Sequence, residues 1–416
     1  MLNINLSSLQ RQKLELMKFK SYLLPAFMLM TFLSMQAQEI TDNKFGKGLI
    51  NLTAKDSSYS ITLGGTLQFL YSSQWDDSEN EGFQSGESNF LIRRTRLNLD
   101  GFAYSPKLKY KLQMGFANRD QSAASVYTNK APGIILDALL KWNFYENFEL
   151  WAGQTKLPGN REELTSSTSL QTVDRSLLNS NFNVGRDMGF QLHHFFEIGD
   201  KFVIKEAVAI SQGEGRNVTS GNLGGYQFTG RLDILPFGDF ADFKGGDLKR
   251  ETLPKLSLGV SFDHNKNAVR TRSNAGSYML NDLGLFETDI NTFFLDAIFK
   301  FQGISFMGEY ANRTSDNAIA INSDGTATGD VVNIGNALNL QAGYLLKSNY
   351  EILGRYTNIT LDRDITGQEV ENQYTLGLSK YIVGHNLKVQ TDFGYNDFDN
   401  NFTDNLIYRL QFSIHF

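Results

Sequence analysis

The most suggestive chemical groups in this sequence are pairs of basic side chains two positions apart. Arg94 and Arg96 form one such pair, and Lys109 and Lys111 form another. Residues two apart in a β-strand project to the same face of a sheet, so each pair would place two positive charges side by side. A guanidinium pairs with two oxygens of a phosphate or carboxylate, whereas an ammonium acts as a point charge. The pattern therefore predicts contact with small anions.

Strands are expected because apolar and polar residues alternate along most of the chain. The last segment, 406–416, is the clearest: Leu410 and Phe412 belong to its apolar face, whereas Arg409 and Gln411 belong to its polar face. Strict alternation over such a length is typical of a strand with one apolar and one polar side. Eleven residues also suit a tilted strand that crosses a bilayer. We therefore expect an all-β, transmembrane antiparallel barrel.

The same alternation recurs often enough to count strands. Sixteen segments are predicted, with bounds uncertain by a few residues: 60–71, 90–102, 108–116, 134–144, 148–156, 186–196, 202–211, 226–235, 255–264, 289–301, 304–312, 336–346, 350–361, 371–382, 385–393 and 406–416. The connections between them alternate between short and long, as in outer-membrane barrels with short periplasmic turns and longer extracellular loops. The barrel comprises residues 60–416, and both ends of the chain then lie on the periplasmic side. A closed sheet is required because no unpaired backbone edge is stable in hydrocarbon.

One connection breaks the alternation. Residues 236–254 should be a short periplasmic turn, but they span about nineteen positions. Two interpretations stay open, an insertion or a pair of strands without clear alternation.

The N-terminus has the pattern of a secretory signal peptide. Lys18 and Lys20 precede an apolar run, and cleavage after Ala37 would remove residues 1–37; Met17 could be the true start. Residues 38–59 would then be a short periplasmic leader. Removal of 1–37 takes away four basic residues and one acidic residue, so the net charge falls from −6 to −9. Such a chain has no basic surplus for nucleic acid.

Catalytic and metal-binding patterns are weak. The chain has no cysteine and five histidines. His193 and His194 are adjacent, so their rings would point to opposite faces of a strand and could not share a metal ion. No Gly-x-Ser-x-Gly or His-Glu-x-x-His motif is present. An outer-membrane barrel hydrolase stays as the alternative of a different class, but we expect no enzyme, no metal site and no cofactor.

Several segments resemble the phosphate-selective porins of the O and P type. They follow in the order of that family along the mature chain, although each is weak alone: Phe90-Leu91-Ile92-Arg93-Arg94-Thr95-Arg96-Leu97, Gly153-Gln154-Thr155-Lys156-Leu157-Pro158-Gly159, Thr165-Ser166-Ser167, Val173-Asp174-Arg175-Ser176, Gly185-Arg186-Asp187-Met188-Gly189 and 384–416. Asp174 stands where the family more often has Glu. The resemblance implies a sixteen-stranded, trimeric outer-membrane porin for small anions, surrounded by lipid and lipopolysaccharide.

The resemblance also implies that segment 157–185 folds inward and narrows the pore. An ordinary exterior loop is the alternative for this segment. Together with the inward polar faces of the strands, the resemblance implies a basic track for phosphate or polyphosphate through the channel. The residues of this track are Arg94, Arg96, Lys109, Lys111, Lys156, Arg161, Arg175, Arg186 and Arg231.

Acidic residues with inward parity leave a second interpretation open. Asp233, Glu309 and Asp392 would face the same lumen. Opposed charges across a pore give little selectivity, so a general porin for small solutes is the alternative function.

Overall fold

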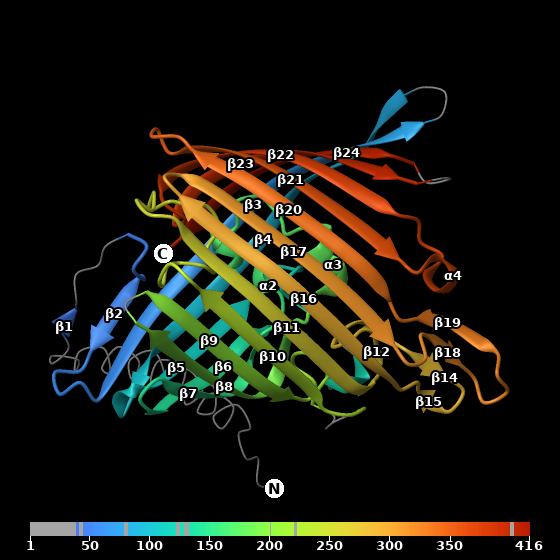
Figure 1. Cartoon of the computed structure of the whole chain (residues 1–416), viewed down its shortest axis with the longest axis horizontal. Helices are drawn as coiled ribbons and strands as arrows, with labels where there is room; N and C mark the ends of the chain where they lie inside the picture. The colour runs from blue at the N-terminus through green and yellow to red at the C-terminus, as the bar shows by residue number, and fades with distance from the viewer. Residues whose placement is uncertain are drawn as a thin grey trace, which may run out of the picture.

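Among the residues that the structure describes, sixteen antiparallel strands form one closed barrel (Figure 1). This computed structural model describes residues 39–40, 45–78, 82–121, 125–128, 133–199, 201–219, 223–399 and 403–416. The predicted signal peptide, residues 1–37, lies outside them. The predicted fold class, an all-β antiparallel barrel of about sixteen strands, is confirmed. Within the described part of the chain, no helix is long and apolar enough to cross a bilayer.

The barrel strands follow one another around the wall in chain order. They are β3 (Tyr59–Ser78), β4 (Gly82–Ala103), β5 (Ser105–Gly115), β6 (Ile135–Tyr145), β7 (Phe148–Lys156), β8 (Arg186–Ile198), β9 (Phe202–Ser211), β10 (Gln227–Leu235), β11 (Lys255–Ala268), β16 (Thr288–Phe301), β17 (Ile304–Ser315), β20 (Gly335–Leu345), β21 (Tyr350–Leu361), β22 (Glu371–Val383), β23 (Leu387–Phe398) and β24 (Asn405–His415). The barrel closes where β24 pairs with β3, from Asn405 opposite Asp76 to His415 opposite Thr66. Closure leaves the wall without a free edge along this seam.

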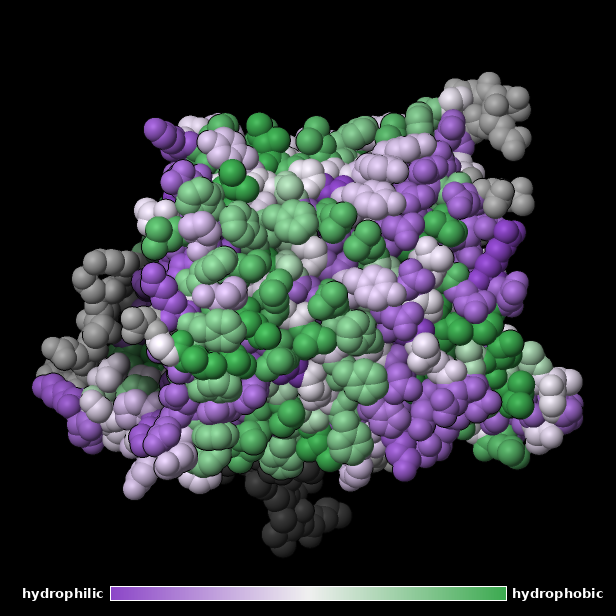
Figure 2. Space-filling model, in the orientation of Figure 1, coloured by the Kyte–Doolittle hydropathy of each residue, from purple (hydrophilic) through white to green (hydrophobic). Residues whose placement is uncertain are grey.

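Alternation along each strand separates an apolar outer face from a polar inner face. On β24, Phe412 is 53% exposed on the outside, whereas Gln411 and Ser413 are buried inside, as predicted. Figure 2 shows apolar side chains spread across the strands and hydrophilic ones gathered toward the end with the long connections. An apolar outer band is what a barrel presents to lipid tails.

The two ends of the barrel differ in the length of their connections. Short turns lie at one end, together with the C-terminus and the hairpin that β2 (Ile50–Thr53) forms with β3; β1 (Glu39–Ile40) pairs with β2. Apart from segment 157–185, the long connections at the other end carry eight small elements among the described residues: η1 (Val126–Thr128), β12 (Arg270–Arg272), β13 (Ala275–Tyr278), β14 (Leu280–Asn281), β15 (Gly284–Leu285), β18 (Ile319–Ile321), β19 (Ala327–Val331) and α4 (Arg363–Thr366).

The first hairpin is longer than predicted. Strand bounds of 60–71 and 90–102 are too short, because β3 continues to Ser78 and β4 begins at Gly82. The additional residues are mostly polar and do not alternate, so the pattern ended early. Cross-strand contacts sustain the pairing instead, such as the 2.7 Å hydrogen bond between the hydroxyls of Ser73 and Ser88.

Residues 236–254 contain no strand, and all of them are described. They join β10 to β11 at the end with the short turns. Of the two interpretations of this connection, the structure supports the insertion.

Candidate functional site

Segment 157–185 leaves β7 and runs inside the barrel before it returns to β8. It contains α2 (Arg161–Leu164), η2 (Ser167–Ser169) and α3 (Leu177–Phe182), which lie behind the wall in Figure 1. The hydroxyl of Ser176 caps α3 by accepting a hydrogen bond from the amide of Asn179. Most residues of this segment are buried, so the strands enclose it over much of its length.

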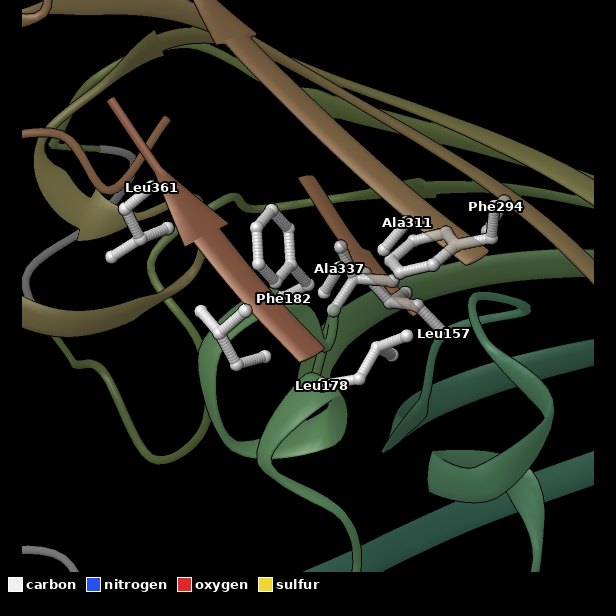
Figure 3. Close-up of a cluster of buried hydrophobic side chains, with 10 residues drawn as sticks. Leu157, Leu178, Phe182, Phe294, Ala311, Ala337 and Leu361 are labelled. Atoms are coloured by element: carbon white, nitrogen blue, oxygen red, sulfur yellow. The ribbon is translucent and has the colours of Figure 1, made fainter. Parts of the chain in front are cut away.

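An apolar cluster holds the second half of the segment against the wall (Figure 3). Leu178 and Phe182 of α3 are fully buried against Phe294, Ala311 and inward-facing residues of β20 and β21. Complete burial of a leucine or phenylalanine side chain contributes about 1.5–3 kcal/mol. Small residues on the inner face, such as Ala311, leave the room that these side chains fill.

A buried network of charges holds the first half of the segment. Arg161 is fully buried, and its Nε lies 2.6 Å from Oδ1 of Asp296 on β16. Its Nη2 lies 2.8 Å from Oδ1 of Asp233 on β10. Arg231 shares both carboxylates, with Nη1 2.8 Å from Oδ2 of Asp296 and Nη2 2.7 Å from Oδ1 of Asp233. The charges of Arg161 and Arg231 are thus paired with carboxylates.

The tip of the segment reaches the opposite wall. Nζ of Lys388 donates a 2.6 Å hydrogen bond to the carbonyl of Leu170, and the amide of Val173 donates to Oδ2 of Asp392 at 3.0 Å. Lys388 and Asp392 lie on β23, far around the barrel from β7. The segment therefore crosses the lumen and divides it.

The inserted turn 236–254 packs beneath this crossing. The amide of Gly245 donates a 2.8 Å hydrogen bond to the carbonyl of Ser169 in η2. Nε2 of His385 lies 3.1 Å from the carbonyl oxygen of Gly245, and Nζ of Lys300 donates to the carbonyls of Ala241 and Lys244 at 2.7 Å each. The turn and segment 157–185 together occupy the side of the lumen next to β10–β23.

Open space lies on the other side, next to β5–β9. A cavity of about 820 Å³ is bounded there by wall residues that include Lys109, Trp151 and Lys205, and by Asp239 and Phe243 of the inserted turn. Nζ of Lys205 lies 2.8 Å from Oδ1 of Asp239. Lys109 is exposed, and no ion pair joins it to another described residue. This open space lies between the inserted turn and this part of the wall.

Two of the basic residues predicted for the track share one carboxylate. Nζ of Lys111 lies 2.8 Å from Oδ2 of Asp137 on β6, and Nε of Arg186 lies 2.8 Å from its Oδ1. Arg96 forms a similar pair with Asp120, and its Nη1 also donates a 2.8 Å hydrogen bond to the hydroxyl of Ser167. Arg96, Lys111 and Arg186 thus lie along one wall, and a carboxylate partly neutralises the charge of each.

Lys156 and Arg175 brace the segment from within. Lys156 donates hydrogen bonds to the carbonyls of Glu163, Leu164 and Thr165, and Arg175 donates a 2.7 Å hydrogen bond to the carbonyl of Thr165. Burial acts to raise the pKa of Glu163, but Arg175 and Lys156 outweigh it and lower the pKa to about 2. The Glu163 carboxylate is therefore ionised at neutral pH.

A β-bulge in β4 adds a basic residue to the inner face. The pairing shifts between Gln68 and Phe69 of β3, which leaves Arg93 as the extra residue of β4. A bulge bends the strand and re-aims its side chains. Arg93 consequently lies on the inner face beside Arg94. Nη2 of Arg93 is 2.5 Å from both carboxylate oxygens of Asp174.

The histidines are dispersed. His193 stacks on Trp151 inside the barrel at a ring distance of 3.9 Å, whereas His194 stacks on Phe148 outside and pairs with Glu206. In the described part of the chain, no three His, Asp or Glu side chains are arranged to hold a metal ion.

Comparison with known families identifies the chain. Residues 68–412 match the family described as phosphate-selective porin O and P. The chain belongs to this family. It is an outer-membrane porin, and the end with the short turns is the periplasmic end.

Solved structures share the fold of this porin at low sequence identity. An anion-selective porin from Comamonas acidovorans is 12% identical, with a TM-score of 0.54 over 86% of this chain and 100% of that chain. The outer-membrane channel DcaP of Acinetobacter baumannii is 13% identical, with a TM-score of 0.51 over 87% and 99% of the two chains. A comparison with curated protein sequences gives no match.

The predicted track leaves out three basic residues that the structure places inside this porin. Arg93 has the wrong parity for a regular strand, and only the bulge turns it inward. Arg119 follows β5, where no alternation gives direction. Arg409 was assigned to the inner face of β24 but not to the track; its distance of 3.5 Å from Asp174 comes from the crossing of segment 157–185. The one signal in the sequence that could have drawn attention to Arg93 is the Arg93-Arg94 pair directly after the apolar run 90–92.

Proposed function

We propose that this porin carries small anions across the outer membrane, with a preference for phosphate-like oxyanions. The observation that supports this most directly is the concentration of basic side chains along one side of the divided lumen: Arg93, Arg94, Arg96, Lys109, Lys111, Arg119 and Arg186. Rings and rows of arginine and lysine favour anions where a pore is narrow. Segment 157–185 supplies the narrowing in this proposal.

Arginine predominates in this row, which favours oxyanions over halides. Its planar fork offers two parallel N–H donors to two oxygens, which chloride cannot match. The family description and the anion-selective porin of similar fold are in keeping with this proposal.

The general porin stays as the second candidate because carboxylates oppose several of these cations. Asp120, Asp137 and Asp174 each contact at least one of them. A hydrolase has less support, since the histidines are dispersed in the structure. We also propose a homotrimer embedded in lipid and lipopolysaccharide, a signal peptide at 1–37 and a periplasmic leader at 38–59.

Single-channel recording in planar bilayers tests the proposal. At low ionic strength, a salt gradient should give a reversal potential of anion-selective sign, and added phosphate should block the chloride current. The double variant Arg94→Gln and Arg96→Gln should shift the reversal potential toward cations, whereas Arg363→Gln on the exposed α4 should not. Cation selectivity of the wild type, or no response to phosphate, would favour the general porin.

A further inference from the structure

Four arginines from three parts of the chain converge on one carboxylate in the lumen. Asp174 of segment 157–185 contacts Arg93 at 2.5 Å, Arg409 at 3.5 Å, Arg94 at 3.8 Å and Arg119 at 4.0 Å. Arg93 and Arg94 lie on β4, Arg409 on β24, and Arg119 after β5. Such a convergence of guanidinium groups on two oxygens is the arrangement that proteins use to bind oxyanions.

Positive charge exceeds negative charge at this cluster. Among the described residues, the one other carboxylate in an ion pair with these four arginines is Asp392, with Oδ1 2.6 Å from Nε of Arg409. The four arginines therefore outnumber these two carboxylates by two charges. Burial of an unbalanced charge is costly unless a counterion joins it.

Hydrogen-bonding capacity also remains unused. The Nε atoms of Arg93 and Arg94 are buried and have no acceptor among the described residues. Buried donors of this kind are normally paired. Both atoms belong to guanidinium groups that already face the Asp174 carboxylate, so this carboxylate leaves part of their donor capacity unused.

The backbone and side chain of Asp174 are held by different groups. Its carbonyl accepts hydrogen bonds from Nη1 of Arg355 at 2.9 Å and from the hydroxyl of Thr172 at 2.6 Å. Among the described residues, the four arginines alone contact the carboxylate. Burial acts to raise the pKa of Asp174, but these arginines, Arg93 first, hold the pKa well below its usual range. A rotation about the side-chain bonds can therefore release the carboxylate while the segment stays in place.

The most exposed arginine of the site is Arg119, which lies in the long connection after β5. The side chain of Arg119 is 50% exposed, whereas those of Arg93 and Arg409 are 11% and 13% exposed. An anion that enters from outside would meet Arg119 first and the buried arginines next.

We propose that Asp174 is a tethered anion that occupies an oxyanion-binding site formed by Arg93, Arg94, Arg119 and Arg409, and that a passing phosphate displaces it. The carboxylate competes with the solute for the same donors, so the site binds phosphate weakly enough to release it. Conduction requires binding that is favourable but reversible. This inference rests on the proposed anion conduction and adds a residue that sets its affinity.

Phosphate block of the chloride current, recorded for wild type and Asp174→Asn, tests the inference. Without the competing carboxylate, the half-blocking phosphate concentration should fall about tenfold. This is the change expected when phosphate no longer has to break one charge-assisted contact in order to bind. Asp174→Glu should return the value toward wild type. Asp282→Asn removes the same charge from an exposed extracellular hairpin, where Asp282 contacts Ser323, and should have no effect.

Three outcomes distinguish the tethered anion from the proposed anion conduction. Block in both proteins with an equal or higher half-blocking concentration in Asp174→Asn overturns the tethered anion and leaves anion conduction intact. No block in either protein, together with no anion preference, overturns both. If Asp174→Asn does not fold, Asp174→Ser is recorded in its place, with heat-modifiable migration on gels as the check of folding; the same shift is expected, and its absence overturns the inference.

Discussion

Nε of Arg161 lies 2.6 Å from Oδ1 of Asp296, and both side chains are buried inside the barrel. This ion pair joins the segment that crosses the lumen to the wall at β16. Arg231 contacts the same carboxylate from β10, so neither arginine stands alone in the interior. The pair explains how a polar segment is held in position inside a wide barrel.

Arg161→Gln should loosen the crossing segment. Removal of one partner from a buried ion pair typically costs about 3–5 kcal/mol, because the remaining charge keeps its desolvation penalty. We expect a lower midpoint in urea unfolding and greater open-channel current noise. Arg363→Gln removes the exposed arginine of the pair with Glu369 and is the control. It should lower the free energy of unfolding by less than Arg161→Gln does. An Arg161→Gln channel with the stability and the current noise of wild type would show that Arg161 does not hold the segment in position.

Gly245→Ala should disturb the contact between the inserted turn and segment 157–185. A Cβ atom at Gly245 would lie 2.5 Å from the carbonyl oxygen of Ser169, so the two backbones must separate. Overpacking of this kind costs typically about 1–3 kcal/mol. We expect a lower melting temperature and a changed conductance. Gly230→Ala on β10 is the matched control, because its Cβ would meet nothing within 4 Å. Equal behaviour of the two variants would refute the contact.

Lys109→Gln should lower the anion current at low salt. Lys109 is exposed at the cavity wall, so its charge acts on passing ions without a carboxylate to offset it. The effect should fade near 1 M salt, where the Debye length is about 3 Å. Reversal potentials recorded at both salt concentrations measure it. An effect that persists unchanged in high salt would point to altered pore geometry.

Glu214 should make stability depend on pH in the range below neutral. Burial raises the pKa of this carboxyl from its usual 4.5 to about 7, although the amides of Gly224 and Leu223 act in the opposite direction. Between these two values the unfolded chain has released its proton and the folded chain has not, so stability falls as pH rises. Glu214→Gln should remove this part of the slope in melting temperatures recorded from pH 4.5 to 7. An unchanged slope would exclude Glu214 as its source.

Much of the wall could be predicted because lipid on one side and water on the other impose a strict alternation. Strand β24 illustrates this, with Phe412 outside and Gln411 inside. Prediction failed where the alternation is interrupted. The polar ends of β3 and β4 were assigned to a loop, and Arg93 was left out because a bulge shifts its parity.

The sequence by itself determined the barrel, its strand number and the supply of basic residues to the lumen, since each of these follows from local periodicity. Only the tertiary structure decided which charges meet. Arg161 and Asp296 are 135 positions apart, and Arg409 and Asp174 are 235 apart. Their pairing depends on the path of segment 157–185 across the lumen, and this path is determined by packing against distant strands, which no local pattern encodes.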